Sequence, residues 1–331
     1  MQYPKNMIDF LDNFSTEEQC LQALEEIRWE NKCPQCGSSD YWRHGKRRTR
    51  ICSGCRTHLS VTADTALHRL RIPLRAVFLI WWYMVVSKQG VSSEELATLL
   101  WISPPTAWLW NQKFRKIMVR EDRTQLEGHV EIDEVFIWGA QSWPRWRWAK
   151  GKKIAVVAVE INMEKSNKKW LFRGMGRARI KIIPNCSEKT LMAFIEENVV
   201  AGSTVYTDKW TSYNSLDKKG YTHIFQQESV STDEVIWVHG NEVTPNVHII
   251  ASLVKRWLLG THQQYLVRNE YLQDYLEEYT FRFNRRKSSN RWKLFQTLLE
   301  QILSYRPTTR NTIRSHEKQP PEKNTSLVVP G

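Results

Sequence analysis

The spacing of hydrophobic residues changes near Gly128, from a helical period before it to the alternation of strands after it. Before that point, apolar residues at helical spacing predict an amphipathic helix that begins near Ser15, with Ser15 as its cap. A longer apolar stretch after Pro73 predicts a second helix that runs to Val86. After Gly128, apolar runs predict strands at residues 129–138, 154–161 and 170–183.

Two capped helices lie in quick succession in the front half. Ser92 and Glu95 form a capping-box pattern, and Ser103 followed by Pro104 starts the next helix, which continues to about Met118. The short break between them predicts a helix-turn-helix. Two short helices with a tight turn are also common in ordinary helical domains, so both interpretations stay open.

The rear half combines strands with helices. A helix at residues 187–198 leads to a short strand that ends at Asp208. Later helices are expected at residues 245–259, 268–283 and 291–304. This alternation predicts an α/β domain with a mixed sheet and flanking helices. From Arg306 onward apolar residues are few, so we expect a disordered tail.

Four of the six cysteines form two Cys-x-x-Cys pairs, Cys33 with Cys36 and Cys52 with Cys55. Two such pairs supply the four thiolates that tetrahedral Zn²⁺ binds in a structural site, which predicts a zinc ribbon. The pattern then divides the chain into four parts. They are the N-terminal helix and ribbon, a helical region with the helix-turn-helix outline, an α/β domain and the tail, at residues 1–65, 66–125, 126–305 and 306–331.

The net charge of +13 favours a polyanionic partner, and nucleic acid is the expected one. The longest apolar run, residues 76–86, is too short to span a bilayer, and the first residues have no secretory pattern, so we expect a cytoplasmic, nucleoid-associated protein. The candidate DNA contacts are Arg47, Arg48, Arg50, Asn111, Lys113, Arg115, Arg145, Arg147, Lys152 and Lys153. The alternative is that these groups are solvated and that the nearby tryptophans belong to the core.

Two aspartates lie where strands are predicted. Asp133 is inside the first strand of the rear half, and Asp208 ends the later short strand. A buried strand tolerates a carboxylate only when it is paired or bound to a cation, so the two could form a Mg²⁺ site at one edge of a sheet. Alternatively Asp208 caps a turn, and Asp133 is a solvated acid beside Glu131 and Glu134.

A third element is the helix with Thr244 as its cap and Gly260 just past its end. On one face it carries His248, Ser252 and Lys255 at positions i, i+4 and i+7. The positive end of the helix dipole favours a neutral imidazole, the form that binds a metal. A surface histidine beside a solvated lysine is the simpler alternative.

Several segments together resemble a known family. They are RWENKCPQCGSS, the later CSGC, VEIDEVFIWG, VYTDKWTSYNSL, and the stretch from VHIIASLVKRWLLGTH to YLQDYLEEYTFRFNRR, which span about residues 15 to 290. Their order and spacing resemble insertion-sequence transposases with an ISXO-two-like transposase domain, which are zinc-ribbon members of the DDE superfamily. The resemblance implies an RNase H-like core, binding of terminal inverted repeats, two-metal strand cleavage and transfer, and a homo-oligomer on double-stranded DNA.

The resemblance also assigns residues. It implies that Asp133 and Asp208 are the first two catalytic acids and that Lys255 is the lysine of the pattern. Counted back from the end of the helix, the third acidic position is His248, so this chain departs from the pattern. A histidine nitrogen brings no negative charge, and we therefore expect weaker retention of Mg²⁺ and better use of Mn²⁺. The departure keeps open a catalytically inactive or domesticated DNA-binding protein as the alternative function.

Overall fold

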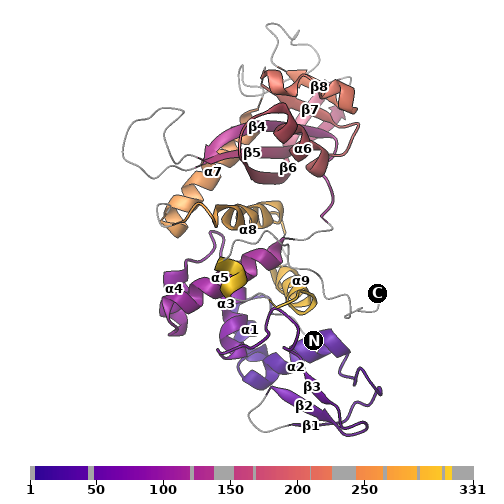
Figure 1. Cartoon of the computed structure of the whole chain (residues 1–331), viewed down its shortest axis with the longest axis vertical. Coiled ribbons are helices and arrows are strands. Elements are labelled where there is room, and N and C mark those ends of the chain that lie inside the picture. Colours follow the sequence, from indigo (N-terminus) through magenta and orange to yellow (C-terminus); the bar gives the residue numbers. More distant parts are fainter. Residues whose placement is uncertain are drawn as a thin grey trace. The chain divides into compact units, whose positions relative to one another are not determined.

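The computed structural model describes residues 4–43, 48–119, 123–137, 153–166, 169–208, 210–225, 244–263, 267–288, 291–307 and 310–314. The chain forms two compact units (Figure 1). The first contains residues 1–121 together with 288–331, and the second contains residues 122–287. The second unit is therefore inserted into the first along the chain.

The first unit begins with helices α1 (Met7–Asn13) and α2 (Glu17–Trp29), followed by a three-stranded antiparallel sheet. Its strands are β1 (Tyr41–Arg43), β2 (Thr49–Cys52) and β3 (His58–Ser60). The Arg28 side chain on α2 donates to three backbone carbonyls at and just after β3, at 2.8–3.0 Å. These bonds fix the small sheet to α2.

The rest of the first unit is helical. It contains α3 (Leu74–Val86), α4 (Ser93–Leu100), α5 (Pro104–Met118), α9 (Arg291–Ser304) and α10 (Arg310–Arg314). Five aromatic rings from α1, the loop after it, α3 and α9 form its centre, with ring centroids 4.8–5.9 Å apart in the contacting pairs. They are Phe10, Phe14, Phe78, Trp82 and Phe295. Aromatic pairs of this kind stabilise the folded state by more than the burial of their apolar area alone.

Helix α9 differs from the sequence-based expectation in its partners. The sequence placed residues 291–304 at the end of the predicted α/β domain, but Phe295 is fully buried in the aromatic centre of the first unit. Part of the expected tail is also structured, because α10 is a short helix. Residues 315–331 lie outside the described residues.

The second unit is built on a five-stranded mixed sheet in the order β6-β5-β4-β7-β8. The pairs β4·β5 and β5·β6 are antiparallel, whereas β4·β7 and β7·β8 are parallel. The strands are β4 (His129–Ile137), β5 (Lys153–Ser166), β6 (Lys169–Ile183), β7 (Thr204–Thr207) and β8 (Thr222–Phe225). The sequence pattern located the first four and missed β8, which is short and only partly buried.

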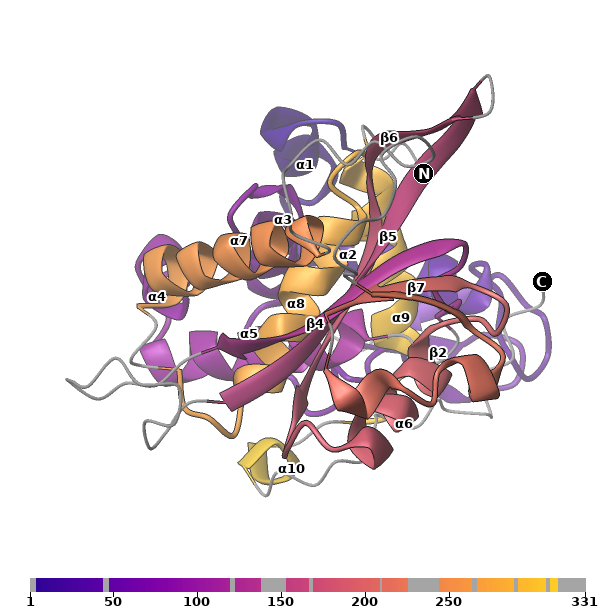
Figure 2. The same ribbon diagram turned by 90° about the horizontal axis from the view of Figure 1, so that it is seen from above.

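Helices cover both faces of this sheet, as Figure 2 shows for α6 (Glu188–Asn198) and α7 (Pro245–His262). Side chains of α6 pack with Val130 and Ile132 of β4 in one apolar core, so the even-numbered positions of β4 face α6. Glu131 and Asp133 face the opposite side, where α7 lies on β4 and β5. The short helices η1 (Thr211–Tyr213) and η2 (Asp217–Lys219) join β7 to β8.

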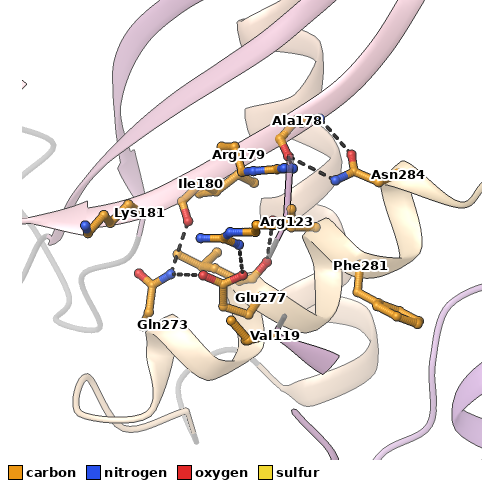
Figure 3. Close-up of polar contacts among 12 residues, drawn as sticks. Val119, Arg123, Ala178, Arg179, Ile180, Lys181, Gln273, Glu277, Phe281 and Asn284 are labelled. Carbon is orange, nitrogen blue, oxygen red and sulfur yellow. Dashed lines mark hydrogen bonds and ion pairs between the residues drawn. The ribbon is translucent and has the colours of Figure 1, made fainter. Parts of the chain in front are cut away.

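Helix α8 (Leu272–Asn284) covers the outer edge of the sheet (Figure 3). The Asn284 side chain accepts from the Ala178 backbone N–H at 2.7 Å and donates to the Ala178 carbonyl at 3.1 Å. Gln273 accepts from Ile182 N–H at 2.8 Å and donates to the Ile180 carbonyl at 3.1 Å. The two amides therefore satisfy the outward backbone groups of β6 much as a neighbouring strand would.

Helix boundaries match most of the sequence expectations, with two corrections. The cap of α2 is Thr16 rather than Ser15, because Thr16 and Gln19 form the capping box. Helix α7 continues through Gly260 and ends at His262. Its C-cap residue is Gln263, which has left-handed backbone. Ser92 and Ser187 cap their helices through side-chain bonds, at 3.0 and 3.4 Å. Among the helices of the described ranges, none has the length and apolar composition needed to cross a membrane.

Candidate functional site

The four paired cysteines converge at the tip of the small sheet. The sulfur atoms of Cys33, Cys36, Cys52 and Cys55 all lie within 4.8 Å of one another. The Cys33 and Cys55 sulfurs are 3.7 Å apart, and those of Cys36 and Cys52 are 3.4 Å apart. None of the four forms a disulfide. Four clustered thiols are the donor set of a structural Zn²⁺ site, so these residues fit the predicted metal.

The two Cys-x-x-Cys turns share one backbone geometry. In each, the N–H of the first cysteine donates to the carbonyl five residues later, at 2.8 Å for Cys33 and 3.0 Å for Cys52. In each, the residue after the second cysteine has left-handed backbone, with φ of 72° at Gly37 and 62° at Arg56. The pair of turns thus presents the four sulfurs to one point.

A second polar group lies on β4, at the face covered by α7. Asp133 Oδ2 accepts from the Thr244 hydroxyl at 3.0 Å and lies 3.6 Å from His248 Nε2. Thr244 is the N-cap residue of α7, as predicted, but its hydroxyl donates to Asp133 and forms no side-chain bond with the helix. Burial raises the pKa of Asp133, and the charge of Asp208 raises it further. The structure therefore brings Asp133 and His248 into contact distance from two separate elements.

Asp208 follows β7, the parallel neighbour of β4, as the sequence pattern predicted. Its Oδ1 accepts from Trp210 N–H at 3.1 Å, so it also orders the turn that leads to η1. Its charge raises the pKa of Asp133 on the adjacent strand. Asp208 therefore follows the strand that pairs with β4, and the grouping of the two aspartates in one metal site stays a prediction.

Glu131 holds the start of α7 on β4. Its carboxylate is fully buried and accepts from the Asn246 N–H and side-chain amide, both at 2.8 Å, and from Val247 N–H at 3.2 Å. These are unsatisfied donors of the first helical turn, where a negative charge is also favoured by the helix dipole. Glu131 therefore sets the position of His248, one residue after Val247, relative to Asp133. The sequence analysis considered Glu131 only as a solvated acid. Because Glu131 is two residues before Asp133 in a strand, the two share one face of the sheet, and this spacing could have indicated its role.

Glu134 is a further acid that the sequence analysis did not select. It lies on the opposite face of β4, where Tyr213 donates to its Oε1 at 2.6 Å. Burial raises its pKa to about 7, with added contributions from the charges of Asp133 and Asp208. Three carboxylates therefore lie close enough to repel one another.

The donor set suits a hard divalent cation. Carboxylates that are desolvated and mutually repulsive lose that repulsion when a cation binds between them. Asp133 and Asp208 could offer oxygen ligands, and His248 could offer a nitrogen that Mn²⁺ accepts more readily than Mg²⁺. Within the described ranges, only the four cysteines place three or more ligand atoms within 4.8 Å of one another. The residues fit Mg²⁺ or Mn²⁺ by chemistry.

Lys255 lies two turns beyond His248 on α7, and both side chains are exposed to solvent. Lys255 is therefore free to meet a ligand that passes along this helix. It takes no part in the core, which α7 joins through Ile250, Val254 and Leu258.

Two predicted DNA contacts in the ribbon serve the fold instead. Arg48 binds Glu17 at 2.7 Å and the carbonyls of Leu70 and Ile72 at 3.0 and 2.9 Å. Arg50 forms an ion pair with the buried Glu25. Both guanidinium groups are occupied within the first unit, which corrects their assignment as surface DNA contacts.

The three predicted contacts on α5 are also corrected. Asn111 is buried and donates to Ser93 at 3.1 Å, which links α5 to α4. Lys113 is buried, donates to the Ala66 carbonyl at 3.3 Å and lies over the Trp110 ring. Arg115 is fully buried as well. This part of α5 is buried on all sides, because six consecutive residues, 110–115, are buried.

Of the remaining candidates, Lys153 is described. It begins β5 opposite Ile137 and is partly exposed. Arg47, Arg145, Arg147 and Lys152 lie outside the described residues.

Comparisons with known proteins agree with these two centres. Residues 15–58, which include all four clustered cysteines, match the transposase zinc-ribbon domain. Residues 125–284, which include Asp133, Asp208 and His248, match the ISXO2-like transposase domain. An uncharacterized protein in transposable element ISH50 of Halobacterium salinarum is 24% identical over 261 residues, covering 75% of this chain and 85% of that protein. The chain therefore carries a transposase zinc-ribbon domain followed by an ISXO2-like transposase domain.

Proposed function

We propose that the protein binds the ends of its own mobile element and catalyses metal-dependent DNA strand cleavage and transfer at Asp133, Asp208 and His248. The observation that carries the proposal is the 3.6 Å approach of His248 Nε2 to Asp133 Oδ2, on the domain matched to the transposase family. If the third position had decayed to a residue without a role, nothing would hold His248 beside Asp133. The inactive or domesticated alternative is therefore not favoured.

The sheet order supports an RNase H-like core. The central strand β4 has an antiparallel neighbour on one side and a parallel neighbour on the other, and both candidate aspartates lie on this central parallel pair or directly after it. Helix α7 adds its residue from the face opposite α6. Three separate elements would thus contribute to one site.

Each residue has a distinct task in this proposal. Asp133, the most buried of the three, would bridge both metal positions, while Asp208 and His248 would complete the ligand set. Bound Mg²⁺ or Mn²⁺ would supply the positive charge that activates water or a 3′-hydroxyl and stabilises the leaving oxygen. Thr244 orients Asp133 through its hydroxyl. Lys255 would hold a phosphate beside the scissile bond as a point charge.

The first unit would deliver the DNA end. The net charge of +13 favours phosphate binding, and the zinc ribbon is a compact support for such contacts. Helices α4 and α5 remain a candidate helix-turn-helix, with the exposed start of α5, rather than its buried middle, as the part able to meet DNA. Strand transfer between two ends would require a homo-oligomer on DNA.

The test is strand transfer on a duplex that carries the element's own ends, in Mg²⁺ and separately in Mn²⁺. Asp133→Ala and Asp208→Ala should abolish activity in both, and Glu197→Ala, which removes an exposed carboxylate of α6, is the matched control. Full activity of both aspartate variants would end the proposal.

His248 is tested in the same assay. His248→Ala should lose activity, whereas His248→Glu should regain it and shift the preference toward Mg²⁺. Full activity of His248→Ala would remove His248 from the ligand set while leaving the two aspartates in place.

A further inference from the structure

Arg56 occupies a backbone position that favours glycine. Its φ is 62°, in the second Cys-x-x-Cys turn, and the matching residue of the first turn is Gly37, with φ of 72°. A side chain with a Cβ is disfavoured in this region, and glycine adopts it without cost. The same turn is therefore built once with the residue that suits it and once with an arginine that does not.

The Arg56 side chain is supported by an exposed aromatic ring. Its guanidinium carbon lies 4.8 Å from the centroid of the Trp42 ring, and both side chains are exposed, Trp42 to 49%. An indole of this size is usually covered, so its exposure beside a cation marks a binding surface. Stacking also limits the conformations of the arginine, which lowers the entropy cost of a later contact.

The neighbouring arginines of the ribbon clarify what Arg56 does. Arg48 and Arg50 bind carboxylates and carbonyls of the first unit, and their guanidinium groups are partly buried there. Arg56 instead is exposed to solvent, next to the second cysteine of the zinc turn. A guanidinium that rests its face on an indole keeps its N–H edge available, in the fork geometry that matches a phosphate.

We propose that Arg56 and Trp42 form a phosphate-binding site for duplex DNA on the outer face of the zinc ribbon. Arg56 donates two N–H bonds to one backbone phosphate, and Trp42 holds the guanidinium in place. The inference rests on the proposed function, since it assumes that the ribbon meets DNA. The proposed contact also explains why an arginine occupies this position, because the phosphate contact would offset the unfavourable φ of Arg56.

The test compares Arg56→Gly with wild type in equilibrium binding to two duplexes of equal length, one from the element's own end and one of random sequence. Arg56→Gly should bind both about 10-fold more weakly at moderate salt, as expected for one lost phosphate contact. The slope of log affinity against log salt should fall by about one. Trp42→Ala should lose part of the same affinity, and Arg56→Lys, which keeps the charge but not the stacked fork, should fall between.

The chain offers a matched control in Arg69, another exposed arginine with left-handed backbone, at φ of 53°. Arg69→Gly removes the same charge and the same strain outside the ribbon, and it should leave both affinities within about twofold of wild type. Because glycine suits position 56, Arg56→Gly should keep its zinc and unfold at the same or a higher temperature. A merely structural arginine would give the opposite result, with lower zinc content and a lower unfolding temperature.

Three results would overturn the inference. They are wild-type affinity in Arg56→Gly, a loss confined to the element's own end, and a loss that parallels zinc release. If wild type binds and recombines DNA while Arg56→Gly does so equally well, only this site is wrong. If wild type binds neither duplex, the proposed function fails together with the site.

Discussion

Substitution of Glu131 is the strongest test of how the site is assembled, because the buried carboxylate of Glu131 holds α7 on β4. In Glu131→Ala, the Asn246 and Val247 N–H groups lose their acceptor inside a buried region. The Asn246 side-chain amide loses its acceptor too. The helix start would then have to open to water or remain unsatisfied.

The magnitude follows from these contacts. A hydrogen bond to a charged group contributes about 1.5–3 kcal/mol, and the three here share one carboxylate and do not add fully. The charge at the helix start contributes about 0.3–1 kcal/mol more. Burial opposes this gain, as the rise in the pKa of Glu131 to about 7 shows. We therefore expect Glu131→Ala to lower the free energy of unfolding of the second unit by about 3 kcal/mol.

The assay is native-state hydrogen exchange of the amides in the first two turns of α7, with urea unfolding as a second measure. Glu131→Gln keeps the shape and one acceptor oxygen, and it should lose only about 1 kcal/mol. Strand transfer by Glu131→Ala, measured where the protein is still folded, should fall further than its folded fraction, because His248 is no longer held beside Asp133. A loss below about 1 kcal/mol, or equal losses in both variants, would refute the anchoring role.

Three further outcomes follow from the first unit and the sheet edge. Chelation of zinc should abolish binding to the element's end and unfold β1–β3 while exchange protection of β4 to β7 persists; end binding that survives chelation would contradict this. Asn284→Ala removes both bonds to Ala178 and should cost the second unit about 2 kcal/mol in urea unfolding, with Asn284→Asp losing less because it keeps the acceptor. Burial raises the pKa of Glu25 to about 7 despite its pairing with Arg50. The folded unit therefore retains a proton that the unfolded chain releases near pH 4.5, so this contribution to stability is complete below that pH and is lost as pH rises through 7. Urea midpoints at pH 5 and pH 7 should differ less in Glu25→Gln than in wild type, and equal differences would contradict the assignment.

Local pattern was enough to place most elements of the fold. Helix caps, Cys-x-x-Cys spacing and strand alternation depend on residues a few positions apart, and they located β4, β7 and α7 with their candidate residues. The relation between Asp133 and His248 was expected only through the family resemblance, since the two elements are separated by more than a hundred residues of sequence.

Long-range partners explain the errors. The sequence shows that Arg48 and Arg50 are cationic, but not that Glu17 and Glu25 of α2 lie opposite them. Lys113 was selected by residue type. The packing of α5 buries this lysine, and its ammonium donates to a backbone carbonyl. Residue type gives the chemistry of a group, and its burial depends on contacts that lie far away in sequence.

The position of α9 has a consequence for the order in which the nascent chain folds. Phe295 completes the aromatic centre of the first unit, yet it is synthesised only after the whole second unit. Until then Phe10 and Trp82 lack a central neighbour, so the N-terminal unit matures last although its residues come first. A chain truncated anywhere before α9 would leave the first unit incomplete, whatever the state of the candidate site in the second unit. Completion of translation would thereby act as a checkpoint for whatever the first unit binds.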